Sequence, residues 1–233
     1  MNTYLKAIGE LLENRKNYLK SLKNPTQIQI NKLDFINKLM IFIDNRILNV
    51  EIYKILNGSS TFADDFNQYI LYLLMQKIVN IFPENERDLL ILNAIQFFST
   101  KNIIPNSSRI KYSNMGFMYM IKIMSLMTDK ENFYAEVNER IFKPLKIEEK
   151  FIPVHILTKE NLKNKFPNQN YYSKFRDVNI RVNIYDINYN EMDSLNGGLI
   201  SDLDSTIKAT CEISKMYLGL KNLLTNIPET SSK

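Results

Sequence analysis

The sequence predicts a mainly α-helical protein with a few short strands. Three observations support this fold class. Apolar residues recur at intervals of three and four in many segments, as they do along one face of a helix. Proline, or a cluster of Asn, Gly and Ser, closes several of these segments. Strict alternation of apolar and polar residues, which is typical of a half-buried strand, is rare.

The first predicted helix spans residues 4–22, where leucines at helical spacing are separated by Glu and Lys, and Pro25 ends it. Residues 26–30 alternate Thr-Gln-Ile-Gln-Ile, which predicts a short strand or an extended lead-in. The helical spacing then returns repeatedly. Further helices are predicted at residues 33–45, 50–56, 64 or 65 to 81, 86–98, 115–127, 133–142 and 203–218.

Turn-forming residues divide these helices. Stops are predicted at residues 57–60 (Asn-Gly-Ser-Ser), at Pro83 and at Pro144, and residues 103–108 form a predicted loop. Asn114 is a candidate N-terminal cap for the helix that follows it, because its side-chain oxygen can accept a first-turn amide hydrogen. Residues 148–194 have no sustained period and predict an irregular excursion that contains one strand at residues 178–184. A turn is expected at Gly197-Gly198.

Composition excludes several kinds of chemistry. The chain has 233 residues and 45% hydrophobic residues, enough for a sizeable core. Cys211 is the single cysteine and His155 the single histidine. An internal disulfide, Ser-His-Asp and Cys-His mechanisms, and metal sites built from several Cys or His ligands are therefore excluded. With no nucleotide-binding glycine loop visible either, we expect no cofactor and no metal.

Charge and hydropathy limit the partners. The net charge is +5, but Lys and Arg are scattered among Asp and Glu, so a nucleic-acid partner is not expected. The N-terminus lacks a cationic stretch followed by an apolar core, so no secretory signal is predicted. The longest apolar run, residues 115–127, is shorter than the roughly 18 residues that span a bilayer. We therefore expect a cytoplasmic protein without a membrane span.

The most specific stretch of the sequence is residues 111–117, Lys-Tyr-Ser-Asn-Met-Gly-Phe, followed by residues 138–145, Asn-Glu-Arg-Ile-Phe-Lys-Pro-Leu. Together they resemble the YSN region of the class C β-lactamase and penicillin-binding-protein-like serine hydrolases. The pattern of that family is PG-x-x-F-x-YSN-x-G-Y, a helix, and then E-x-I-F-x-PLGM. Residues 105–111 are similar to its lead-in, residues 42–47 to its LVEEGKL segment, and residues 196–204 to its AGGL-x-STA-x-D segment. The similar segments fall in family order from about residue 26 to 220.

The resemblance implies acyl transfer by three motifs. A serine and a lysine in S-x-x-K at the start of a helix share one face, so the amine can help take the hydroxyl proton. In Y-x-N, which Tyr112 and Asn114 match, the tyrosine oxygen shares that proton network and the asparagine contacts the substrate. A K/H-T-G strand completes the acyl site. Tyr112 and Asn114 are the candidate catalytic residues by resemblance. The alternative is that Tyr112 is simply a half-buried aromatic residue with a hydrogen-bonded hydroxyl and that Asn114 is only a helix cap.

The serine of the first motif has no clear counterpart. One alignment of residues 26–32 places Lys32 at the nucleophile and Phe35 at the lysine, and a shifted one places Lys32 at the lysine and Gln29 at the serine. Two chance matches to S-x-x-K also occur. The first, Ser108 to Lys111, is predicted in a loop, and the second, Ser205 to Lys208, is predicted on the surface of a helix. The chain ends before a segment that would carry the K/H-T-G motif.

The resemblance also shapes the expected fold, because the strands that build the family's central sheet lie outside the matched segments. We expect the helical region of the β-lactamase and DD-peptidase-like fold, with the central sheet largely missing. The predicted organisation is an N-terminal amphipathic helix (1–24), a partial β-lactamase-related domain (25–225) and a flexible tail (226–233).

Two functions follow as hypotheses. The first is a degenerate or truncated β-lactamase-related hydrolase, inactive on its own, whose inherited reaction would be amide or ester hydrolysis through an acyl-enzyme with a peptide, β-lactam or ester ligand. The alternative is a non-enzymatic helical interaction protein that binds a protein partner through the apolar surface that the missing sheet leaves exposed.

Overall fold

Helices dominate the structure, as the sequence predicts. The computed structural model describes residues 6–59, 62, 74–75, 77–78, 80–99, 112–148, 150–153, 156–157, 160–161, 164, 170–175, 178–183 and 199–225. In this part of the chain the strands form two separate two-stranded antiparallel sheets. Within the same residues, no helix is both long enough and apolar enough to cross a membrane.

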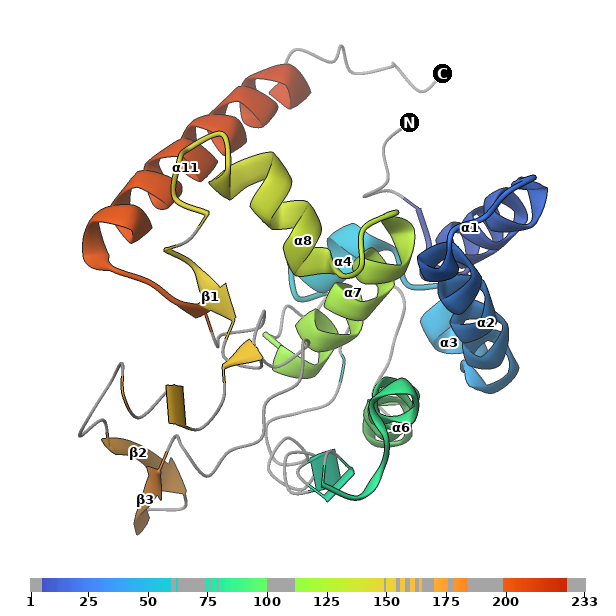
Figure 1. The fold of residues 1–233 in the computed structure, drawn as a ribbon, viewed down its shortest axis with the longest axis horizontal. Helices are drawn as coiled ribbons and strands as arrows, with labels where there is room; N and C mark the ends of the chain where they lie inside the picture. Colours follow the sequence, from blue (N-terminus) through green and yellow to red (C-terminus); the bar gives the residue numbers. More distant parts are fainter. Residues whose placement is uncertain are drawn as a thin grey trace, which may run out of the picture.

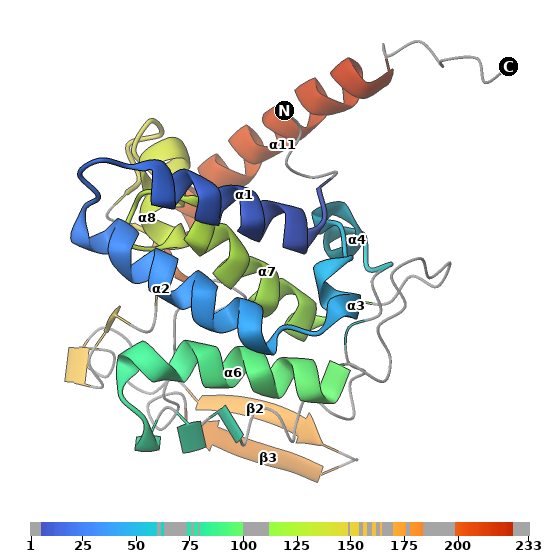
Figure 2. The same cartoon turned by 90° about the vertical axis from the view of Figure 1, so that its right-hand side faces the viewer.

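A helical bundle occupies the N-terminal part of the chain (Figure 1). Its helices are α1 (Ile8–Ser21), α2 (Gln27–Phe42), α3 (Asn45–Leu48), α4 (Ile52–Leu56), α6 (Glu84–Ser99) and α7 (Asn114–Met127). Figure 2 shows α2 running antiparallel to α1 and α7, so the first turn of α2 lies near the end of α7. The apolar faces of these helices share one core, whose fully buried members include Leu12, Ile36, Ile47, Ile91 and Ile123.

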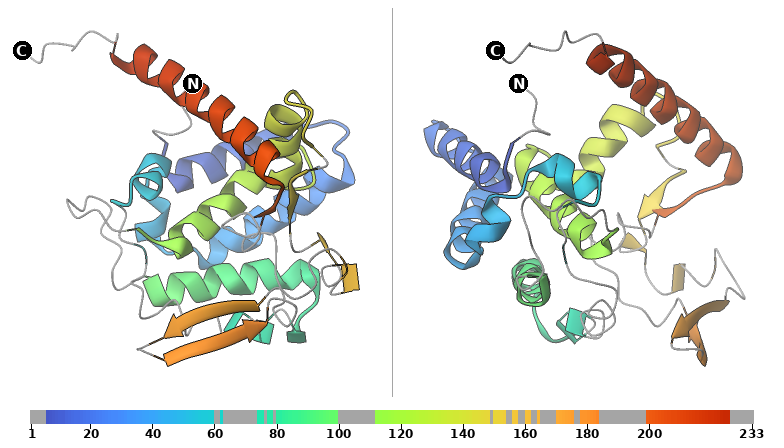
Figure 3. Two further views of the ribbon diagram at one scale, coloured as in Figure 1. Left: turned by 90° about the vertical axis from the view of Figure 1, so that its left-hand side faces the viewer. Right: turned by 180° about the vertical axis from the view of Figure 1, so that it is seen from behind.

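A second and smaller structure follows α7, and we call it the C-terminal lobe. It consists of α8 (Phe133–Val137), the π-helical turn η2 (Asn138–Phe142), the paired strands β1 (Ile152–Pro153) and β4 (Leu199–Ile200), and α11 (Leu203–Thr225). Its own core contains Phe142, Ile147, Phe151 and Ala209. Helix α11 lies on the outer side of α8 and continues beyond the rest of the lobe (Figure 3).

A β-hairpin lies apart from the bundle in Figure 1. Strands β2 (Asn170–Phe175) and β3 (Val178–Asn183) pair antiparallel, with Asn170 opposite Asn183 and Phe175 opposite Val178. The alternation at residues 178–184 thus predicted a real strand, whereas its partner β2 carries no comparable alternation and was not predicted.

The prediction of a strand or extended lead-in at residues 26–30 was wrong, because α2 begins at Gln27. A capping box starts the helix there. The Thr26 hydroxyl accepts from the amide of Gln29 at 3.3 Å, and the Gln29 side chain accepts from the amide of Thr26 at 2.9 Å. These reciprocal bonds satisfy two first-turn donors, and this local chemistry outweighs a short alternation of Gln and Ile.

Most other predicted helices are confirmed with shifted ends. Helix α2 is one continuous helix that ends at Phe42, and α11 runs to Thr225 rather than 218. Of the predicted helix ending at Ile81, the described residues from 74 onward are helical. The rest of that helix, the loop at 103–108, Gly197-Gly198 and the tail from 226 lie outside the described residues, as does His155.

Candidate functional site

The N-terminal end of α7 carries the predicted catalytic pair. Tyr112 is 62% exposed, and its hydroxyl donates to the Asn114 side-chain oxygen at 2.7 Å. The Tyr112 ring also lies 5.4 Å from the ring of Phe117. The two residues therefore lie together at the start of α7, with Tyr112 exposed.

The predicted cap of α7 was off by one residue. Ser113 is the N-cap, and its hydroxyl oxygen accepts from the amide of Gly116 at 3.2 Å. Asn114 is the first residue of the helix, so its side-chain oxygen is available for the bond from Tyr112. Ser and Asn both favour the N-cap position. Ser113 occupies it because its backbone is extended, as an N-cap requires, whereas Asn114 already belongs to the helix.

Gly116 is required by packing rather than by backbone conformation. A Cβ at this position would lie 3.3 Å from Cγ2 of Ile55 on α4 and 3.4 Å from Cγ of Phe62. Helix α7 therefore approaches α4 closely, immediately after the Tyr-Ser-Asn segment. Tyr119, three residues after Gly116 on α7, is fully buried, and its hydroxyl has no hydrogen-bond partner within the described structure. Burial raises the pKa of the Tyr119 hydroxyl well above its usual range.

Lys32 lies at the opposite, C-terminal end of α7. It is 6% exposed, and its ammonium donates to the backbone carbonyls of Ser125 at 2.6 Å, Thr128 at 2.9 Å and Lys130 at 2.5 Å. The last carbonyls of a helix have no intrahelical partner and carry partial negative charge, so a buried cation is well placed there. Lys32 therefore caps the end of α7 through three hydrogen bonds to backbone carbonyls.

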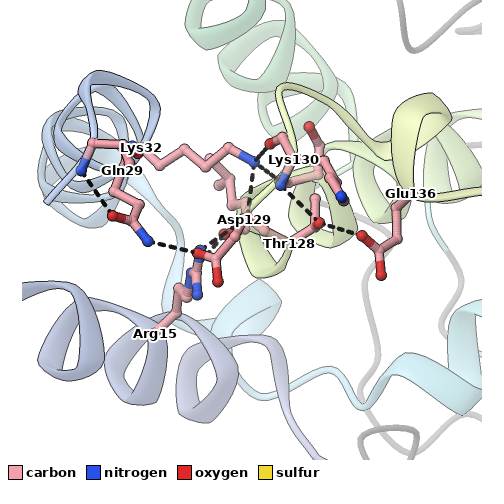
Figure 4. Close-up of polar contacts among 10 residues, drawn as sticks. Arg15, Gln29, Lys32, Thr128, Asp129, Lys130 and Glu136 are labelled. Atoms are coloured by element: carbon pink, nitrogen blue, oxygen red, sulfur yellow. Dashed lines mark hydrogen bonds and ion pairs between the residues drawn. The ribbon is translucent and has the colours of Figure 1, made fainter. Parts of the chain in front are cut away.

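Arg15 of α1 binds the same turn from another direction (Figure 4). Its Nε donates to the carbonyl of Leu126 at 3.0 Å, and its Nη2 donates to the carbonyl of Thr128 at 2.9 Å and to Asp129 Oδ1 at 2.7 Å. The planar guanidinium presents several donors in a fixed fork, which suits this set of acceptors. The end of α7 is thus capped by cations from two other helices.

Acidic side chains complete this cluster. The bond from Arg15 holds the pKa of the Asp129 carboxyl below its ordinary value of 3.8, and the bond from Gln29 also lowers it. Gln29 reaches Asp129 at 3.1 Å. The Thr128 hydroxyl donates to Glu136 of α8 at 2.6 Å and lowers the pKa of that carboxyl. We call Arg15, Gln29, Lys32, Thr128, Asp129 and Glu136 the polar joint.

The structure does not bring Lys32 or Gln29 to the candidate catalytic residues Tyr112 and Asn114. Tyr112 and Asn114 lie at one end of α7, while Lys32 and Gln29 bind the other end, about 20 Å away for a 14-residue helix. Phe35, the other residue aligned with the lysine, lies with its ring 4.8 Å from the Lys122 ammonium.

The second S-x-x-K match also has a structural role. Ser205 is buried in the first turn of α11, where its amide donates to Asp202 at 2.8 Å. Lys208 donates to the carbonyl of Leu145. The first match, Ser108 to Lys111, lies outside the described residues. Among the residues that the structure describes, no group of three or more His, Cys, Asp and Glu side chains could hold a metal ion.

Comparisons with protein-family models, curated proteins and solved structures find no match to this chain. The site must therefore be interpreted from its geometry. Sequence reasoning found Tyr112, Asn114 and the two registers of Lys32, but it missed Arg15, Thr128 and Asp129. No local pattern marks these residues, because Arg15 and Leu126 are 111 positions apart.

Proposed function

We propose that this chain is a non-catalytic relative of the penicillin-binding-protein-like serine hydrolases, and that it acts as a helical binding protein. The observation that carries this proposal is the position of the Lys32 ammonium. Its ammonium is bound by three backbone carbonyls at the far end of α7 from Tyr112. An amine at the far end of a 14-residue helix is out of hydrogen-bonding reach of a hydroxyl beside Tyr112, so it cannot take that proton.

Two backbone features support descent from that family. The family pattern has glycine at YSN-x-G, and Gly116 at this position allows the close approach of α4. The pattern also has glycine in PLGM, and here Lys146 occupies that position with φ of 57°. This is the left-handed region that glycine adopts without cost. At these two positions of the family pattern, a glycine would serve a physical purpose in this fold.

The nature of residue 29 supports loss of the acyl-transfer reaction. In the register that aligns Lys32 with the family lysine, Gln29 takes the place of the serine. Its amide bonds Thr26 and Asp129, so it holds the helix start and the polar joint. A carboxamide provides no hydroxyl for an acyl-enzyme.

Exposed apolar side chains support a binding role. On α2, Ile41 is 76% exposed and Phe42 is 57% exposed. On α11, Leu203 is 74% exposed and Ile207 is 53% exposed. Leu203 and Ile207 are four residues apart and therefore share one face of α11. Contiguous exposed apolar patches mark surfaces that contact another protein.

A labelling experiment with a fluorescent penicillin tests the loss of chemistry. We expect no covalent labelling of the full chain under conditions that label an active penicillin-binding protein completely. Labelling that disappears in Ser108→Ala or Ser205→Ala would overturn the proposal and establish a serine nucleophile. Labelling that persists in both but disappears in Tyr112→Phe would also overturn it.

The binding role is tested separately by light scattering and by capture of partners on the immobilised chain. We expect the parent to bind a protein partner, and we expect Leu203→Lys combined with Ile207→Lys to lose that binding while its helix content stays unchanged. A variant that binds as tightly as the parent would exclude this face of α11. The matched control is Thr206→Lys, which adds a charge at an exposed position of the same helix.

Hydrolysis of an amide or ester is the second candidate function, and one observation favours it. The Tyr112 hydroxyl bonds the Asn114 side chain, and Tyr112 is exposed, so a ligand can reach this pair. Covalent labelling by the fluorescent penicillin would favour hydrolysis over the binding role.

A further inference from the structure

The bundle and the C-terminal lobe have separate hydrophobic cores. The bundle core is built from α1 to α7, whereas the lobe core is built around Phe142, Ile147, Phe151 and Ala209. Among the described elements, the packing of α8 against α7 is the main contact between the two. The connection in the chain is the turn at residues 128–132, between the end of α7 and the start of α8.

This turn is tied to both sides by polar groups. From the bundle, Lys32 and Arg15 bind the carbonyl of Thr128, and Arg15 also binds the Asp129 carboxylate. From the lobe, Glu136 accepts from the Thr128 hydroxyl, and Glu139 pairs with Lys130 at 2.5 Å. The orientation of the lobe therefore depends on directional bonds to Thr128, Asp129 and Lys130, together with the contact that Phe133 of α8 makes with the bundle core.

We propose that the turn at residues 128–132 is a hinge between the bundle and the C-terminal lobe, and that Arg15 and Lys32 lock it. Connections between two separately packed units absorb backbone rotation at a few residues, whereas packed cores resist it. The lock consists of two side chains that hold the hinge backbone itself. Without them the carbonyls of residues 125–130 have water as their alternative partner, and the lobe turns as a unit about the end of α7.

The distance between the two units measures this directly. Cys211, the single cysteine, is exposed on α11, and Lys38 is exposed on α2. Spin labels on Cys211 and on Lys38→Cys report the separation by pulsed electron paramagnetic resonance. We expect one narrow distance in the parent, and we expect Lys32→Met and Arg15→Met to lose this single distance and give a broad distribution. Lys20→Met, at an exposed position of α1, is the matched control and should leave it narrow.

Folding of each variant is checked by its far-ultraviolet circular dichroism. A narrow distribution in folded Lys32→Met and Arg15→Met proteins overturns the proposal. Should either variant fail to fold, Arg15→Lys decides, because it keeps the charge but loses the fork that spans two carbonyls and Asp129. A broadened distribution in folded Arg15→Lys protein supports the lock, and a distribution as narrow as that of Lys20→Met overturns it.

Discussion

The two ends of α7 are built on opposite principles. At the N-terminal end, Ser113 caps the helix locally, and Tyr112 and Asn114 bond each other on the surface. At the C-terminal end, Lys32 and Arg15 cap the helix from positions 93 and 111 residues away. The N-terminal end can be recognised as a sequence motif because the residues that bond each other are close together in the chain. The C-terminal end stabilises the fold, but no sequence motif marks it because its partners lie far apart in the chain.

This comparison also supports the proposal that the Tyr-Ser-Asn segment is not part of a catalytic centre. The chemistry implied by the resemblance needs a lysine beside the tyrosine. The antiparallel arrangement of α2 and α7 places the start of α2, with Lys32, at the other end of the helix (Figure 2).

The largest expected effect comes from breaking the C-terminal end. In Lys32→Met the apolar volume is kept, but the buried carbonyl of Ser125 and the partly buried carbonyls of Thr128 and Lys130 lose their donor. We expect the free energy of unfolding to fall by about 3 kcal/mol. For a chain of this size the melting temperature should fall by roughly 10 °C. Urea denaturation measures the first quantity and calorimetry the second.

Lys38→Met is the matched control, since Lys38 lies on the exposed side of the same helix and pairs with Asp34. Its effect should stay within about 0.5 kcal/mol. Equal losses in the two variants would contradict a special role for Lys32.

Filling the space at Gly116 tests the other end. In Gly116→Val the added methyl groups would meet Ile55 and Phe62, where a Cβ alone already lies 3.3 Å from the nearest atom. We expect a loss of about 2 kcal/mol from overpacking. Gly116→Ala is the graded control, because one methyl group demands a smaller shift and gains helix propensity. A valine variant as stable as the alanine variant would show that Ile55 and Phe62 shift to make room for the larger side chain at little cost in stability.

Asp129→Asn separates the contribution of charge within the polar joint. The pKa of the Asp129 carboxyl is lowered in the folded state, chiefly by Arg15, so the carboxylate stabilises the fold above its unfolded pKa. That stability is lost as pH falls through the lowered folded pKa. Because the carboxylate is about half exposed, we expect a loss of about 1 kcal/mol or less at neutral pH.

The difference between parent and Asp129→Asn should disappear in acid. Urea midpoints measured at about pH 7 and about pH 2 provide the comparison. A difference of the same size at both pH values would show that Asp129 acts through its shape and hydrogen bonds rather than its charge.

The smallest effect is expected for Tyr112→Phe. The hydroxyl is solvent-exposed and bonds only its neighbour Asn114 within the described residues, so stability should change by less than about 0.5 kcal/mol. Urea denaturation beside Lys32→Met gives the contrast between the two ends of α7. A loss as large as that of Lys32→Met would show that the exposed motif, too, holds the fold together.

Local chemistry accounts for what could be predicted. The helices were visible because their apolar residues repeat at helical spacing, and β3 was visible through its alternation. The error at residues 26–30 arose where two local signals competed and the capping box of Thr26 and Gln29 outweighed the alternation. The unpredicted strand β2 is defined by its pairing with β3, which a single segment does not reveal.

By itself the sequence determined the helical class, most helix positions and the Tyr-Ser-Asn segment, because each depends on residues within a few positions of one another. Tertiary structure alone decided that Lys32 is a buried helix cap and that Arg15 and Asp129 share its site. The reason is physical. A cation is buried where carbonyls of another helix end converge on it, and that convergence exists only once α1, α2 and α7 have packed.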